Sequence, residues 1–247
     1  VTNADISEML GVSAHEASRI AGRWHAKALA FSPARGLQVL IPPDFRTWGV
    51  IPAAQFVDLM MGHLGHGYYV GYLSAAELHG AAHQRPQVFQ VVTDARLRDK
   101  EFGRVRIAFY VSSTVAERPT VTINTPTGTL TVAAVETTVL DLAARTRLGG
   151  GISNVATIIG ELIDDAKLDI VALADLSDRY PTSVLNRTGW LIDHMANQLD
   201  VSLELEPLRA KVDRRTEPAL LVASDPPRGP IDDTWNVYIN ADVEHDL

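Results

Sequence analysis

The sequence predicts an α+β protein with a small N-terminal domain followed by a larger one. Three observations lead to this fold class. The first 27 residues contain two capped helical segments, and a strand, a turn and a second strand follow them. After residue 49, helices and strands succeed one another without the regular alternation of a doubly wound sheet. We therefore expect one domain over residues 1–48 and a second, mixed α+β domain over residues 49–247.

Each of the first two helices begins with the residues of a capping box. Thr2 stands three residues before Asp5, and Ser13 stands three residues before Glu16, so hydroxyl and carboxylate can satisfy backbone amides reciprocally. Gly11 ends the first helix, and helical spacing then predicts one apolar stripe per helix. The expected stripes are Ile6, Met9 and Leu10 on the first helix and Ala17, Ile20, Ala21, Trp24 and Ala28 on the second.

The opposite face of the second helix carries a row of basic side chains. His15, Arg19 and Arg23 follow one another at a spacing of four residues. Residues 29–32 and 37–41 then predict a hairpin, with Arg35 in its turn. Two helices, a tight turn and a hairpin form the layout of a winged helix-turn-helix, whose second helix enters the DNA major groove. The alternative is a small helical domain whose arginines are merely solvated.

A winged helix normally has a further helix ahead of this pair, to complete its three-helix core. Here the helix pair starts at once. Either residues that precede the given sequence supply that helix, or a later element completes the core.

If the second helix enters the major groove, the residues near its start read the bases. We expect His15, Ser18 and Arg19 at base edges, since arginine commonly binds guanine through O6 and N7. We expect the remaining candidates on phosphates, three as cations and three as donors at helix N-termini. These residues are Arg23, Lys27 and Arg35, and Thr2, Asn3 and Ser13.

Charge is distributed unevenly along the chain. The formal net charge is −8, yet residues 1–50 hold five Lys and Arg against four Asp and Glu, a local charge of +1. The remainder carries −9 and is poorly suited to lie along DNA, whereas locally gathered cations are enough to bind phosphates. The absence of cysteine excludes disulfides and thiolate sites. No apolar segment is long enough to span a membrane, so we expect a cytoplasmic protein.

For the second domain we expect six helices and seven strands, including a hairpin around residues 125–128. The expected helices cover residues 53–64, 69–82, 135–148, 153–164, 170–179 and 183–199. The expected strands cover residues 88–93, 105–111, 121–124, 129–132, 201–205, 219–223 and 237–240.

The sequence of this domain gives only weak signals for a metal site. His79 and His83 share a helix face, with His63, His66 and Glu77 as further candidates, but Gly80 weakens the helix and no third ligand has a convincing spacing. We therefore expect polar side chains and no bound metal.

The glycines 149–151 followed by Asp164 and Asp165 resemble the spacing of a nucleotidyltransferase site. That chemistry needs carboxylates that alternate along a strand, and here they are adjacent. We expect a helix N-terminus there instead, and we find no catalytic or cofactor-binding residue. A basic cluster remains open to three interpretations: an extension of a DNA contact, a site for an acidic partner, or a solvated hairpin. It comprises Arg96, Arg98, Lys100, Arg104, Arg106 and Arg118, against Asp99, Glu101 and Glu117.

Two segments resemble the AbiE-type antitoxins (abortive infection, type IV toxin–antitoxin systems). Residues 69–80 contain the Ser-Ala-x-x-Leu-His-Gly stretch of that family. Residues 128–142 resemble its strand followed by Glu-Arg-Thr-x-Leu-Asp-Leu, with Thr137 in place of the arginine. With the N-terminal domain, the resemblance spans most of residues 2–145 in the family's order, and the chain beyond residue 150 is loosely similar to the longer actinobacterial members.

The resemblance implies a transcriptional repressor that binds double-stranded DNA at the operator of its own operon. It also implies an antitoxin that counteracts a nucleotidyltransferase toxin encoded next to it, directly or indirectly. Two other classes remain open from the residues alone. One is a DNA- or nucleotide-processing enzyme with a winged-helix head, and the other is a protein-interaction module whose head is vestigial.

Overall fold

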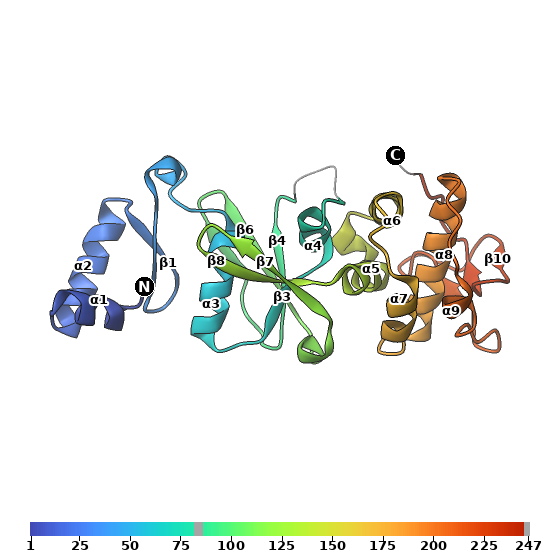
Figure 1. The fold of residues 1–247 in the computed structure, drawn as a ribbon, viewed down its shortest axis with the longest axis horizontal. Helices are drawn as coiled ribbons and strands as arrows, with labels where there is room; N and C mark the ends of the chain where they lie inside the picture. The colour runs from blue at the N-terminus through green and yellow to red at the C-terminus, as the bar shows by residue number, and fades with distance from the viewer. Residues whose placement is uncertain (82–85, 245–247) are drawn as a thin grey trace. The chain divides into compact units, whose positions relative to one another are not determined.

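The computed structural model describes residues 1–81 and 86–244, which form two compact units (Figure 1). Unit 1 comprises residues 1–70, 87–117 and 121–132. Unit 2 comprises residues 71–86, 118–120 and 133–247. The mixed α+β class that the sequence predicts is confirmed. The boundary expected after residue 48 stays a prediction, and residues 1–41, the head, belong to unit 1 together with most of a sheet.

The head consists of two helices and a hairpin, at the blue end of the chain in Figure 1. Both predicted capping boxes are present, from Thr2 to Asp5 and from Ser13 to Glu16. The hairpin contains a bulge between Phe31 and Ala34, and Gly36 has a φ of 82°, which favours glycine in this turn. The elements are α1 (Asn3–Leu10), α2 (Ala14–Ala26), β1 (Ala30–Ala34) and β2 (Leu37–Leu40).

The buried apolar side of the helix pair is narrower than the sequence predicts. Its buried residues are Ile6, Ala17 and Ala21, with Val12, Ile20 and Trp24 packed against them. Met9 and Leu10, expected on the apolar side of α1, are 75% and 54% exposed. They lie in the last turn, directly before the chain reverses at Gly11. Ala28 was also expected on the stripe, but it lies beyond the end of α2 with a φ of 50°.

A six-stranded mixed sheet fills most of the rest of unit 1. Its order is β5-β6-β4-β3-β8-β7, with β3 parallel to β8 and β4 parallel to β6. The strands are β3 (Tyr68–Val70), β4 (Phe89–Thr93), β5 (Lys100–Phe102), β6 (Val105–Val111), β7 (Thr120–Thr125) and β8 (Gly128–Ala133). The neighbouring helices are η1 (Pro43–Phe45), η2 (Ala53–Gln55), α3 (Val57–Leu64) and η3 (Val115–Glu117).

One central strand of this sheet was predicted as helix. Residues 69–82 read as a single helix, but Tyr68–Val70 forms β3, and α4 (Tyr72–Leu78) starts only after Gly71. Tyr69 and Val70 are buried between β4 and β8. A short aromatic and β-branched run is compatible with either structure, because periodicity does not separate a buried strand from a buried helix over three residues.

Unit 2 is mainly helical. After α4 come α5 (Val135–Ala144), η4 (Thr146–Gly149), α6 (Ile152–Asp164), α7 (Ile170–Ser177), α8 (Thr182–Gln198) and α9 (Glu206–Arg209). A small sheet of order β10-β11-β9 follows, from β9 (Ala219–Leu220), β10 (Ile231–Asp232) and β11 (Val237–Tyr238). The strand expected over residues 201–205 is wrong, because Leu205 instead leads into α9.

The C-terminal segment packs directly on α8. Trp235 is 1% exposed and lies against Gly189. The buried guanidinium of Arg187 donates to the carbonyl oxygens of Leu220 (2.9 and 2.7 Å) and Ala143 (2.6 Å). Burial lowers the pKa of Arg187. Residues 219–240 therefore share one core with the helices before them.

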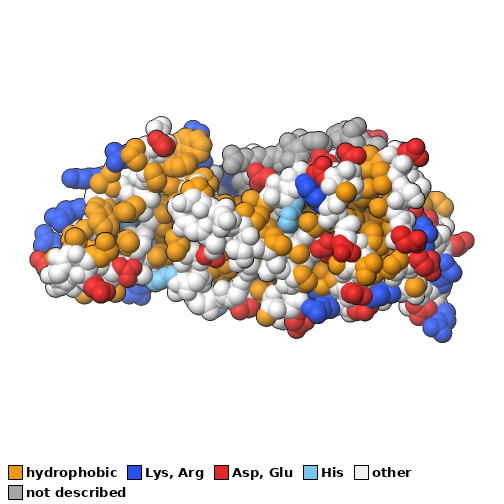
Figure 2. Space-filling model, in the orientation of Figure 1, with side chains coloured by type: hydrophobic (Ala, Val, Ile, Leu, Met, Phe, Trp, Pro, Cys, Tyr) orange, Lys and Arg blue, Asp and Glu red, His pale blue; other side chains and the backbone are white. Residues whose placement is uncertain are grey.

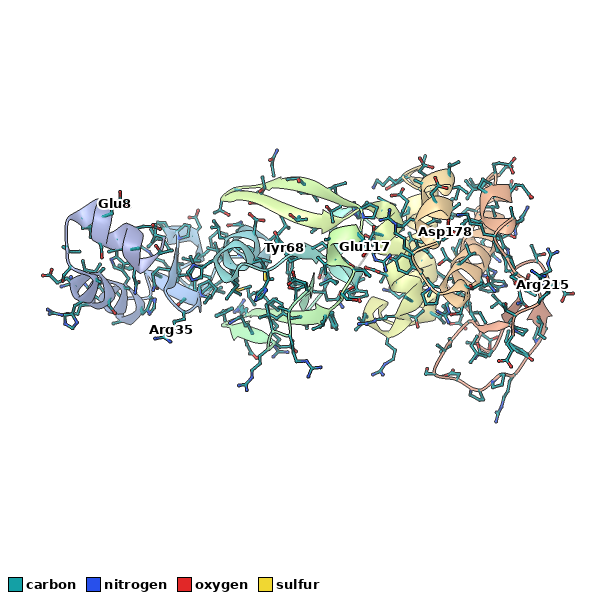
Figure 3. All side chains as sticks on the ribbon, turned by 90° about the horizontal axis from the view of Figure 1, so that it is seen from below. Glu8, Arg35, Tyr68, Glu117, Asp178 and Arg215 are labelled. Atoms are coloured by element: carbon teal, nitrogen blue, oxygen red, sulfur yellow. The ribbon has the colours of Figure 1, made fainter. Side chains whose placement is uncertain are left out.

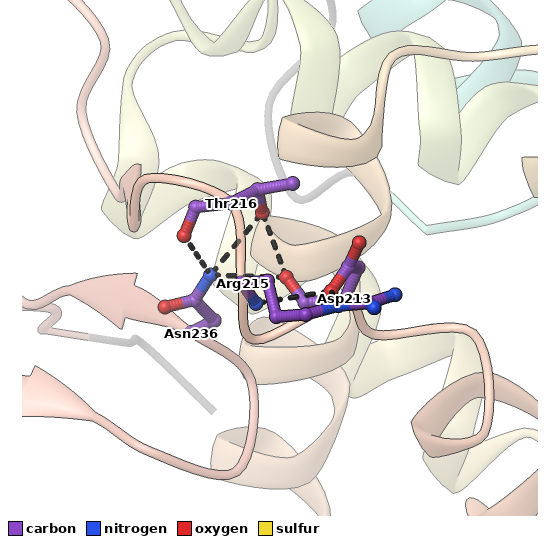
Figure 4. A network of polar contacts seen from close by, with 4 residues as sticks. All are labelled: Asp213, Arg215, Thr216 and Asn236. Atoms are coloured by element: carbon purple, nitrogen blue, oxygen red, sulfur yellow. Dashed lines mark hydrogen bonds and ion pairs between the residues drawn. The ribbon is translucent and has the colours of Figure 1, made fainter.

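A polar network fixes the loop that precedes β9 (Figure 4). The Nδ2 of Asn236 donates to the carbonyl of Thr216 at 3.1 Å and to that of Asp213 at 3.4 Å. The Oδ1 of Asp213 accepts from the backbone and side chain of Arg215 at 3.0 and 3.1 Å, and these bonds lower the pKa of Asp213. Among the described helices of both units, none has the length and apolar content needed to cross a membrane.

Candidate nucleic-acid interface

The outward face of α2 carries the predicted base-reading residues. His15, Ser18, Arg19 and Arg23 are all exposed, and Lys27 is exposed at the C-cap of the helix. Figure 2 shows Lys and Arg side chains along the outer edge of the head. A row of one histidine and two arginines over about two helical turns is a geometry that suits a phosphate-lined groove.

The capping groups of the two helices are already occupied within the head. The backbone N–H of Thr2 donates to the carboxylate of Asp5 at 2.7 Å, which lowers the pKa of Asp5. The backbone N–H and the hydroxyl of Ser13 contact Glu16 Oε2 at 3.2 and 3.1 Å. The predicted contacts of Thr2 and Ser13 with phosphate would therefore replace these carboxylates, whereas the cations of α2 are directly accessible.

A buried glutamine ties the hairpin to both helices. Gln38, in β2, is 5% exposed. Its Oε1 accepts from His25 Nε2 at 2.6 Å, and its Nε2 donates to Asn3 Oδ1 at 3.2 Å. Backbone bonds between Val1 and Gln38, at 2.8 and 2.9 Å, and a bridge between Thr2 and Leu37 extend the hairpin with the start of the chain. Asn3, expected at phosphate, is thus part of the framework that holds the hairpin.

Arg35 lies in the hairpin turn, as predicted. Its side chain is exposed, and Figure 3 shows it at the margin of the head, on the side away from Glu8. Its carbonyl oxygen accepts a hydrogen bond from His63 Nε2 in α3 at 3.0 Å. The hydroxyl of Ser32 lies 2.8 Å from the carbonyl oxygens of both Ala34 and Leu37 and shares its single hydrogen between these two acceptors across the turn. The cation at the tip is therefore held on a rigid support.

The basic cluster of the second predicted domain is divided between the two units. Arg118 belongs to unit 2, where its guanidinium lies 3.7 Å from the ring centroid of Tyr180 and donates to the carbonyl of Arg179. The other five cations belong to unit 1, in the segment that contains β5 and β6. They are Arg96, Arg98, Lys100, Arg104 and Arg106.

The two units differ strongly in net charge. Unit 1 holds ten Lys and Arg against nine Asp and Glu, a net charge of +1. Unit 2 holds twelve Lys and Arg against twenty-one Asp and Glu, a net charge of −9. The sheet of unit 1 is thus no part of the strongly acidic region, although the residues after position 50 were expected to be acidic as a whole.

The histidines considered as metal ligands have other partners. His79 Nε2 donates to the carbonyl of Ala133 at 2.7 Å, and His66 Nδ1 lies 3.4 Å from Asp94. His83 lies outside the described residues. Within residues 1–81 and 86–244, no group of three ligand side chains converges.

The glycine-rich turn at residues 149–151 leads into α6, as predicted. Gly150 and Gly151 have φ values of 86° and 106°, and α6 begins at Ile152. At the other end of the helix, Asp165 pairs with Lys167 at 2.7 Å.

The motif around residues 136–142 has a structural role in unit 2. The hydroxyl of the buried Thr137 donates to the carbonyl of Pro119 at 2.8 Å. Asp141 accepts a hydrogen bond from the hydroxyl of Tyr180 at 2.8 Å. Burial and the adjacent carboxylate raise the pKa of Tyr180, so this phenol stays protonated and remains a donor.

Comparisons with known proteins identify a family and a similar fold. Residues 69–194 match the model of the AbiEi antitoxin C-terminal domain. The fold is similar to the crystal structure of the RV2827C protein from Mycobacterium tuberculosis, with a TM-score of 0.64 and 17% sequence identity over 96% of this chain and 85% of that chain. A comparison with curated protein sequences found no match. The family match spans half of the chain, from β3 to α8, and includes both sequence motifs described above.

Proposed function

This chain belongs to the AbiEi antitoxin family, and we propose that it is a repressor of its own operon that also counteracts a nucleotidyltransferase toxin encoded beside it. The antitoxin part of the proposal rests on the family match. The DNA-binding part rests on one observation, the exposed cationic row of α2 opposite the buried stripe of the head. The proposed DNA partner is the double-stranded operator.

The head acts as a winged helix-turn-helix in this proposal. Helix α2 enters the major groove, with His15, Ser18 and Arg19 toward base edges. Arg23, Lys27 and Arg35 contact phosphates on either side of the groove. The bonds of Gln38 to α1 and α2 support this arrangement, because they fix the hairpin cation relative to the helix.

The proposed division of labour assigns DNA recognition to residues 1–48 and antitoxin activity to residues 49–247. The net charge of −9 makes unit 2 a poor surface for DNA and a suitable one for protein recognition. We propose a non-enzymatic role for this region, since its ionisable motif residues Asp141 and His79 serve packing contacts.

DNA binding is tested with the full chain and a duplex from upstream of its gene. Arg19→Ala should weaken binding by about 1–3 kcal/mol and relax base preference at one position. Arg23→Ala should weaken binding to all sequences alike and lower the salt slope by about one unit. Arg215→Ala is the matched control. It also removes one positive charge, but from a side chain of unit 2 that is 92% exposed and lies outside the proposed DNA contact. Unchanged affinity in both α2 variants would refute the assignment of this helix.

Antitoxin activity is tested by co-expression with the neighbouring toxin gene. A chain that carries Arg19→Ala and Arg23→Ala should still relieve growth arrest while a reporter under its own promoter becomes derepressed. The opposite pattern, retained repression with lost protection, would contradict the division of labour. Point variants are preferable to truncation here, because the head and the sheet of unit 1 share contacts.

A further inference from the structure

A second basic surface in unit 1 surrounds an exposed tryptophan. Trp48 is 46% exposed, and the guanidinium of Arg104 lies 5.9 Å from its ring centroid. Phe45 packs edge-on against the same indole, with ring centroids 5.8 Å apart. Arg46 is exposed between the two aromatic residues in sequence. We call Phe45, Arg46, Trp48 and Arg104 the Trp48 surface.

Backbone contacts hold this surface in place. The backbone N–H groups of Trp48 and Gly49 both donate to the carbonyl of Phe45 at 3.0 Å. The β5–β6 turn approaches so closely that a Cβ on Gly103 would lie 2.9 Å from the carbonyl oxygen of Trp48, and Gly103 has a φ of 54°. Glycine is therefore required there by both backbone angle and space. The structure presents the indole on a fixed support.

The Trp48 surface is connected to the proposed DNA-binding head by aromatic packing. Phe102, at the end of β5, lies 5.4 Å from Phe31 in the hairpin strand β1 and 5.9 Å from Phe56. Phe31 and Phe56 are 5.0 Å apart at an interplanar angle of 82°. The hairpin that carries Arg104 is thus anchored on the same hairpin that carries Arg35.

The carboxylates of this hairpin are partly engaged. Glu101 faces Arg106 at 3.7 Å, with both side chains more than half exposed. Asp99 Oδ1 accepts the backbone N–H of Phe109 at 3.1 Å. Arg104, by contrast, faces an aromatic ring, so its positive charge remains available to an anion.

We propose that the Trp48 surface is a second contact with the DNA duplex bound by the head. Arg46 and Arg104 neutralise phosphates flanking the site read by α2, and the indole of Trp48 lies against the adjacent sugar–phosphate backbone. This inference rests on the proposed function, since it extends the same duplex contact. Continuity with the head favours DNA over an acidic protein as the partner, because Phe102, next to the β5–β6 turn that carries Arg104, packs against Phe31 of the hairpin that carries Arg35.

The first test is the salt dependence of duplex binding by Arg46→Ala/Arg104→Ala. Each lost phosphate contact lowers the slope of log affinity against log salt concentration by about 0.9, so the slope of the double variant should fall by nearly two units. Near 0.1 M salt, each lost contact should weaken binding roughly eightfold. Arg215→Ala should change neither quantity. On a duplex cut back to the α2 site alone, the double variant and the wild type should bind equally.

The second test uses the fluorescence of Trp48. Iodide quenching of the wild type should decrease on addition of the long duplex, and the decrease should be lost in Trp48→Phe. Circular dichroism confirms that each variant is folded.

The outcomes separate this inference from the proposed function. An unchanged slope in the double variant, with a lowered slope in Arg23→Ala, overturns the second contact and leaves the head intact. Absence of duplex binding by the wild type overturns both. If the double variant keeps its slope but loses association with the neighbouring toxin, the surface serves an acidic protein and the DNA assignment is wrong.

Discussion

The contact between Gly189 and Trp235 makes a sharp prediction about unit 2. A Cβ on Gly189 would lie 2.1 Å from both Cε3 and Cζ3 of the indole, which is 1% exposed. Carbon atoms prefer a separation of about 3.5–4.0 Å, so Gly189→Ala creates an overlap of more than one ångström. The indole has to move, because the clash involves its rigid ring and not a flexible chain end.

The free-energy cost of moving the indole follows from the contacts that it makes. Overpacking of a filled core costs about 1–3 kcal/mol. The bond from Trp235 Nε1 to Asp193 Oδ2, at 2.8 Å, has a charged acceptor, and its loss costs about 1.5–3 kcal/mol. Alanine in a helix recovers up to about 1 kcal/mol relative to glycine. We therefore expect Gly189→Ala to lower the free energy of unfolding by about 1.5–5 kcal/mol.

The assay is urea unfolding followed by tryptophan fluorescence and far-ultraviolet circular dichroism. Gly22→Ala is the matched control, because Gly22 lies within α2 and a methyl group there would meet no neighbouring side chain within 4 Å. The control should be as stable as the wild type or more stable by up to about 1 kcal/mol. A Gly189→Ala protein with wild-type stability would refute the packing of residues 219–240 on α8.

Two further predictions concern single polar groups. Arg187→Leu should destabilise unit 2 by about 2–5 kcal/mol in the same assay, because the carbonyls of Leu220 and Ala143 lose their buried donor; a neutral result would contradict the burial of this guanidinium. Asp5 has a lowered pKa, so its stabilising contribution is present above about pH 4 and is lost as the pH falls through the folded-state pKa. An NMR titration of Asp5 should therefore show a midpoint below the ordinary aspartate value of about 3.9, and an unshifted midpoint would contradict the capping box.

Local signals explain the successful part of the sequence analysis. The capping boxes at Thr2 and Ser13 act over three residues, so each helix start is specified by its own neighbours. The strand over Tyr68–Val70 was missed because its identity depends on pairing with β4 and β8, which are distant in sequence. The same holds for the exposure of Met9 and Leu10, which depends on where α2 crosses α1 and not on their helical spacing.

The candidate site also has a part that the sequence predicts and a part that it does not. The cationic row on α2 follows from periodicity, whereas the bonds of Gln38 to His25 and Asn3 join residues up to 35 positions apart. A glutamine in a predicted strand gives no signal of such a role, since most glutamines are solvated. The relation between Trp48 and Arg104 was missed for the same reason, because Trp48 ends the first expected domain and Arg104 lies in the second.

The aromatic trio of Phe31, Phe56 and Phe102 bears on where the molecule can be divided. Phe56 is fully buried, and its ring contacts the hairpin of the head on one side and the end of β5 on the other. A chain cut after residue 48 would expose this ring and remove its partner Phe31. The head and the sheet of unit 1 are therefore coupled by packing. In the proposed complex with DNA, this packing joins the hairpin of the head to β5 and β6, and the turn between those two strands carries Arg104 of the Trp48 surface.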